Sequence, residues 1–96
     1  MYEDIIIETF IARDENSKER VRARPFPGQG YSKYMRVECS TVMRKKYPVG
    51  TKFKIRAHLI DREGAPFLYT HYQWPFSVVT TEEAEQFVKG KTNPVK

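Results

Sequence analysis

A strict alternation of apolar and polar side chains in residues 51–60 constrains the fold more than any other sequence feature. The apolar positions are Phe53, Ile55, Ala57 and Leu59, and the polar positions are Lys52, Lys54, Arg56 and His58. Successive side chains of a β-strand point to opposite faces, so this spacing predicts a strand with one buried and one basic face.

The segment that follows predicts the partner of this strand. Residues 61–64 read Asp-Arg-Glu-Gly, a turn with glycine available for a positive φ, and residues 67–79 are long and aromatic. A hairpin closed by this turn would place Phe53 opposite Trp74 and Leu59 opposite Leu68, with Trp74 buried. On the other face, His58 would lie opposite Tyr69, and Arg56 opposite His71.

Composition favours strands elsewhere too. Val, Ile, Thr, Phe, Tyr and Trp total 34 residues, whereas Leu and Ala total 7. We expect further strands in residues 2–12, 19–24 and 34–41, the first either buried on both faces or paired across a dimer. The sequence PFPGQG of residues 25–30 predicts a loop, and residues 13–18 predict another.

Two segments carry helix signals. Thr80 and Glu83 have the spacing of a capping box, with Gly90 placed to end the helix. Residues 40–46 fit a short helical turn before Pro48, although an extended strand is the alternative. The predicted fold is α+β and mostly β: an antiparallel, curled or barrel-like sheet of about five strands with one C-terminal helix, or else a flatter sheet with the helix on one face. Residues 1–90 form one domain, and residues 91–96 are expected to be a disordered tail.

Several classes of protein are excluded. The longest apolar run, residues 5–7, is far shorter than a membrane span, so we expect no membrane partner, and the single Cys39 excludes a disulfide scaffold. No signal peptide is visible, which favours a cytoplasmic location. The sequence carries neither a cofactor-binding motif nor metal-ligand spacing, so we expect no cofactor and no metal. It also lacks the motifs of RRM, KH and cold-shock domains.

Charge is concentrated in the middle of the chain. Residues 16–56 carry twelve basic and two acidic side chains, a net charge of +10, although the whole chain carries only +5. Lysine and arginine bind phosphates with release of counterions, and nearby aromatic rings can stack on bases. The candidate ligand-binding residues are Arg20, Arg22, Arg24, Lys52, Lys54, Arg56, His58, Tyr69 and His71.

His58 and His71 are the only histidines. The hairpin register puts them on one face beside Arg56, where two imidazoles and a cation could perform acid–base cleavage of RNA. The alternative is two half-exposed strand histidines with no joint role.

We therefore expect a small non-enzymatic binding module whose partner is nucleic acid or another polyanion. One alternative is a homodimer that binds a small molecule or a protein through an aromatic pocket, because 13 aromatic residues exceed what a small core needs. The second alternative is a small ribonuclease that uses the two histidines.

Overall fold

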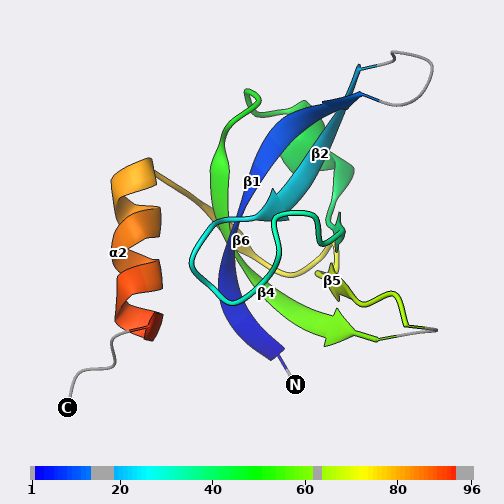
Figure 1. The fold of residues 1–96 in the computed structure, drawn as a ribbon. Coiled ribbons are helices and arrows are strands. Elements are labelled where there is room, and N and C mark those ends of the chain that lie inside the picture. The colour runs from blue at the N-terminus through cyan, green and yellow to red at the C-terminus, as the bar shows by residue number, and fades with distance from the viewer. Residues whose placement is uncertain (1, 14–18, 62–63, 93–96) are drawn as a thin grey trace.

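Two long strands form the centre of the protein. The computed structural model describes residues 2–13, 19–61 and 64–92. In it, β1 (Tyr2–Arg13) pairs antiparallel with β4 (Lys52–Ile60) (Figure 1). The alternation of β4 is confirmed, because Phe53, Ile55 and Ala57 are buried, although Leu59 near the strand end is exposed.

The other strands extend the sheet around these two. β2 (Glu19–Pro25) pairs antiparallel with β1, while β5 (Phe67–Tyr69) and β6 (Phe76–Val79) pair with successive parts of β4. β3 (Val37–Glu38) lies parallel to β5. The strand order is β2-β1-β4-β5-β3, with β6 beside β4, and the sheet curls into a nearly closed barrel (Figure 1).

The curled, mostly β fold is confirmed, but the sheet is mixed and has six strands rather than about five antiparallel ones. A parallel pair needs a long crossover between its strands. The connection from β3 to β5 is such a crossover, because it contains both α1 (Thr41–Lys45) and β4. Local sequence patterns do not reveal pairing across such a distance.

The predicted strand at residues 67–79 is interrupted. The expected pairs Leu59–Leu68 and His58–Tyr69 are present, but Phe53 pairs with Val78, so the register shifts by four residues between β5 and β6. The intervening residues form a turn in which the N–H of Trp74 donates to the carbonyl of His71, at 3.0 Å. Trp74 is therefore half-buried outside the ladder, and its predicted burial opposite Phe53 is wrong.

Two more boundaries differ from prediction. The strand expected at residues 34–41 shrinks to β3, because a turn in which Met35 N–H donates to the carbonyl of Ser32 precedes it. β2 runs through Pro25, and pairing with β1 continues one residue further, because Phe26 N–H donates to the carbonyl of Ile6 at 2.9 Å. The carboxamide of Gln29 then binds both the N–H and the carbonyl of Ile6, at 2.8 Å each.

The two helix predictions are confirmed. α1 is the short helical turn expected after Ser40, and α2 (Thr81–Thr92) is the C-terminal helix. The capping box is formed: Glu83 N–H donates to Thr80 Oγ1 at 3.0 Å, and Thr80 N–H donates to Glu83 Oε1 at 2.8 Å. Gly90 does not end α2, which continues to Thr92. Residues 14–18 and 62–63 of the predicted loops, and 93–96 of the predicted tail, lie outside the described residues.

Apolar side chains form two cores on the two faces of β1. Ile5 and Ile7 join Phe53, Ile55 and Leu68 inside the barrel. On the outer face, Ile6 packs with Phe26, Ala84 and Val88 beneath α2. The first strand is thus buried on both faces by its own chain. No helix within the described residues is long and apolar enough to cross a membrane.

Candidate polyanion-binding groove

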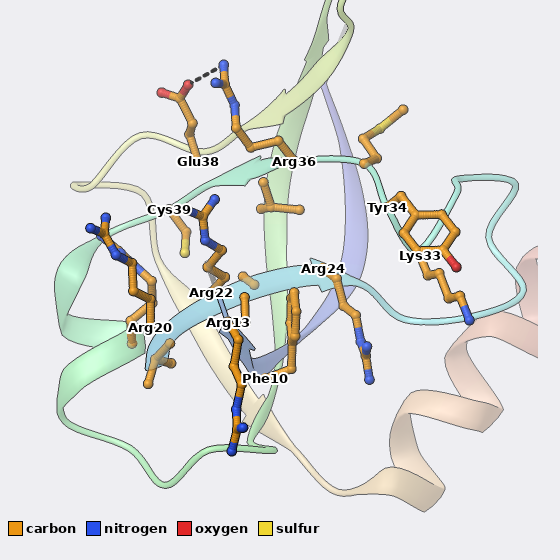
Figure 2. Close-up of a pocket in the computed structure, with 16 residues that line it drawn as sticks. Phe10, Arg13, Arg20, Arg22, Arg24, Lys33, Tyr34, Arg36, Glu38 and Cys39 are labelled. Atoms are coloured by element: carbon orange, nitrogen blue, oxygen red, sulfur yellow. Dashed lines mark ion pairs between the residues drawn. The ribbon is translucent and has the colours of Figure 1, made fainter. Parts of the chain in front are cut away.

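The two ends of the sheet leave a groove between them. β2 and β3 contact each other, but no ladder of hydrogen bonds joins them among the described strands. The groove at this gap, which we call the arginine groove, has a volume of about 760 Å³. Its lining comes from β1, β2, β3, α1 and the loop before β3 (Figure 2).

The lining of the arginine groove is strongly cationic. Seven of its side chains are basic, and Glu38 is its single acidic one. The basic residues are Arg13, Arg20, Arg22, Arg24, Lys33, Arg36 and Arg44. Even with Glu38 counted, the net charge of the residues that line the arginine groove exceeds the net charge of +5 of the entire chain.

The sequence pattern of β2 explains how three of these arginines are placed. Val21 and Ala23 have the inward parity, and Ala23 belongs to the barrel core, so Arg20, Arg22 and Arg24 have the outward parity. Figure 2 shows Arg22 extending from β2 toward Cys39, whereas Arg24 extends in the opposite direction.

Acidic neighbours neutralise some of these cations and not others. Arg24 is 2.9 Å from Glu8 and stacks over Phe10, at 4.6 Å from the guanidinium carbon to the ring centre. Arg36 pairs with Glu38 at 2.9 Å. No carboxylate of the described residues lies within ion-pairing distance of Arg22. Its charge is therefore available to a ligand.

One end of the arginine groove carries an exposed ring. Tyr34 is 86% exposed, and the ammonium of Lys33 lies 5.3 Å from its ring centre. The two side chains lie together at the same end of the arginine groove in Figure 2. A cation and a flat apolar ring at one place can bind a phosphate and a base of the same strand.

Cys39 also lines the arginine groove, but its environment opposes reactivity. Burial raises the pKa of its thiol, and the nearby Arg44 offsets this only in part. A protonated thiol is a poor nucleophile and a poor metal ligand. Within the described residues, no group of three or more His, Cys, Asp or Glu side chains could hold a metal ion.

The structure separates the candidate residues taken from the sequence. Arg20, Arg22 and Arg24 line the arginine groove, but Lys52, Lys54 and Arg56 of the hairpin do not. Lys52 lies 3.8 Å from Glu8 and Arg56 lies 3.4 Å from Asp4, both on the adjacent strand β1. The ammonium of Lys54 lies 5.1 Å from the ring centre of Phe87 in α2.

The remaining three candidates gather elsewhere on the barrel. His58 lies opposite Tyr69 in the sheet, and His71 contacts Trp74 with ring centres 5.7 Å apart. Nδ1 of His71 accepts a hydrogen bond from Gln73 N–H at 3.1 Å, which leaves only its other nitrogen for proton transfer. Neither histidine lines the arginine groove.

Sequence reasoning missed four cations of the arginine groove: Arg13, Lys33, Arg36 and Arg44. Three of them belong to the basic segment 16–56, namely Lys33, Arg36 and Arg44. No alternation of polar and apolar residues links them to the arginines of β2, so nothing in the sequence indicates that they lie in the same groove. Comparison of the chain with protein-family models, with curated proteins and with solved structures found no match.

Proposed function

We propose that this protein binds nucleic acid through the arginine groove. One observation carries the proposal: seven basic side chains from distant parts of the chain line one groove that holds a single carboxylate, and that carboxylate is paired with Arg36. Glu8 and Glu38 offset part of this positive charge, at Arg24 and Arg36, and phosphate groups would neutralise more of it.

The types of residue support phosphate as the ligand. Arginine presents a planar fork of donors that matches phosphate oxygens, and six of the seven groove cations are arginines. Each cation that neutralises a phosphate also releases condensed counterions, so affinity should fall steeply as salt increases. The exposed ring of Tyr34 adds a surface on which a base can stack.

Fluorescence anisotropy with labelled DNA and RNA oligonucleotides tests this proposal. We compare the wild-type protein with Arg22→Gln, and with Lys54→Gln as a matched control that makes the same charge change outside the arginine groove. At low salt the wild type should bind well below millimolar concentration. Arg22→Gln should lower the slope of log affinity against log salt by about one on duplex DNA, and by about 0.7 on single strands.

Lys54→Gln should leave that slope nearly unchanged. Binding no tighter than millimolar at low salt would overturn the proposed function. Equal effects of the two variants would also overturn the assignment to the arginine groove, because nonspecific attraction to net charge does not distinguish between them.

A further inference from the structure

A second surface, made of six rings, lies beside the arginine groove. We call it the aromatic patch, and its members are Tyr2, His58, Tyr69, His71, Tyr72 and Trp74. Three of them form a row across neighbouring strands, since Tyr2 pairs with His58 and His58 pairs with Tyr69. The other three come from the turn between β5 and β6.

The rings contact one another in a continuous set. Trp74 touches Tyr2 edge-on at 5.1 Å between ring centres, and it touches Tyr69 at 6.1 Å. His71 stacks on Tyr72 at 4.6 Å with the ring planes 27° apart. Despite these contacts the outer rings remain open to solvent, because Tyr72 is 71% exposed and Tyr2 is 56% exposed.

Hydrogen bonds hold the turn that carries these rings. Thr70 Oγ1 donates to the carbonyl of Arg56 at 2.7 Å, which fixes the start of the turn against β4. Gln73 N–H binds the His71 ring, and Trp74 N–H binds the His71 carbonyl. The backbone of this turn is therefore fixed before any ligand arrives, so binding would cost little backbone entropy there.

The aromatic patch begins one strand away from the arginine groove. Tyr69 is the parallel partner of Glu38 in β3, and Glu38 lines the arginine groove. Adjacent strands lie about 5 Å apart. The guanidinium of Arg36, also in the groove wall, stacks over Phe67 of β5 at 4.5 Å. The arginine groove and the aromatic patch thus adjoin at the Arg36–Glu38 ion pair, which lies next to Tyr69.

From this continuity we propose that the ligand is a single-stranded nucleic acid, with phosphates in the arginine groove and unpaired bases stacked on the aromatic patch. The inference rests on the proposed function. Every base has a π-face for stacking, but in a duplex these faces are covered by neighbouring base pairs. Open rings beside a phosphate site therefore favour a single strand over a duplex.

Trp74 gives a direct measurement, because it is the only tryptophan in the chain. Its fluorescence should be quenched when a single strand of DNA binds. An abasic strand of the same length carries the same phosphates without bases, so it should bind the arginine groove and leave the fluorescence nearly unchanged. A duplex should likewise cause little quenching.

Variants of Tyr72 test the contribution of stacking to affinity. Tyr72→Ala should weaken binding of the single strand about fivefold or more, with the salt slope unchanged, whereas Tyr72→Phe should retain the affinity. Because Tyr72 is largely exposed, both variants should fold, and their circular dichroism checks this.

The outcomes separate the two proposals. If single strands bind with the salt slope set by Arg22, but Tyr72→Ala has wild-type affinity and Trp74 is not quenched, this inference is overturned and the proposed function stands. Equal affinity for the abasic strand and the ordinary strand would overturn it in the same way. If no oligonucleotide binds at low salt, both proposals fail.

Discussion

Gly28 and Gly30 allow a sharp test of how the loop after β2 meets helix α2. Both have positive φ angles, +93° and +87°, which side chains other than glycine rarely adopt. Their surroundings differ, however. A Cβ added at Gly28 would lie 2.8 Å from Cγ1 of Val88, whereas a Cβ at Gly30 would meet nothing within 4 Å.

The two alanine substitutions should therefore differ in cost. Gly30→Ala should lower the free energy of unfolding only through its backbone conformation, by about 1–2 kcal/mol. Gly28→Ala has the same backbone cost and adds a clash worth about 1–3 kcal/mol. Val88 cannot easily rotate away, because a β-branched residue in a helix has one strongly preferred rotamer. In a domain of this size, each kcal/mol lowers the melting temperature by about 4–8 °C.

Urea denaturation measured by circular dichroism, with Val88→Ala as a second background, separates the two contributions. Val88→Ala removes the clashing methyl group. In that background Gly28→Ala should cost only as much as Gly30→Ala does, which corresponds to a coupling energy of about 1 kcal/mol or more. If Gly28→Ala costs the same in both backgrounds, the packing of α2 on this loop is not as described, and the reasoning is refuted.

Three further predictions concern capping, pH and thiol reactivity. Thr80→Ala removes the cap that binds Glu83 N–H, so in urea denaturation the free energy of unfolding should fall by about 0.5–2 kcal/mol; no change would contradict the capping role. Tyr31 donates a hydrogen bond to Glu3, which lowers the pKa of that carboxyl, while burial and Glu3 together raise the pKa of Tyr31 to about 12. The stability that ionised Glu3 contributes should therefore be lost as pH falls through its lowered pKa. The stability that protonated Tyr31 contributes should be lost as pH rises from about 10 to about 12. In melting curves measured across this pH range, Tyr31→Phe should weaken the pH dependence of stability at both ends. Burial raises the pKa of Cys39, so a thiol reagent at pH 8 should react much faster with the unfolded protein than with the native one, and equal rates would argue against the burial.

Several elements of the fold follow from local chemistry, and these were predictable from the sequence. The alternation of β4, the capping box at Thr80 and the first pairs of the β4–β5 hairpin depend on residues close together in the chain. The prediction failed at Trp74 because Pro75, which has no N–H for the ladder, indicates a bulge or an edge near the strand end but not that all of residues 70–75 leave the ladder. A side-chain bond from Thr70 to the Arg56 carbonyl, together with the turn that follows, stabilises that departure.

The candidate site, like the fold, has one part that the sequence predicted and one part that it did not. The outward parity of Arg20, Arg22 and Arg24 could be read from alternation, and so could the basic face of β4. The structure gives these two sets different surroundings. On β4, Arg56 pairs with Asp4 and Lys52 lies near Glu8, which also pairs with Arg24 of β2. The β2 arginines line one groove with Lys33, Arg36 and Arg44. Strand neighbours decide which charges are paired, and the sequence pattern does not name those neighbours.

By itself, the sequence determined a small β-rich domain, a capped C-terminal helix and a basic central segment. Periodicity and helix capping operate over a few residues, so they are visible without a structure. Only the tertiary structure decided that the sheet is mixed, that β2 and β3 end beside each other without pairing, and that cations from four segments meet in that gap. Closure of the barrel brings these segments together through contacts between residues distant in sequence.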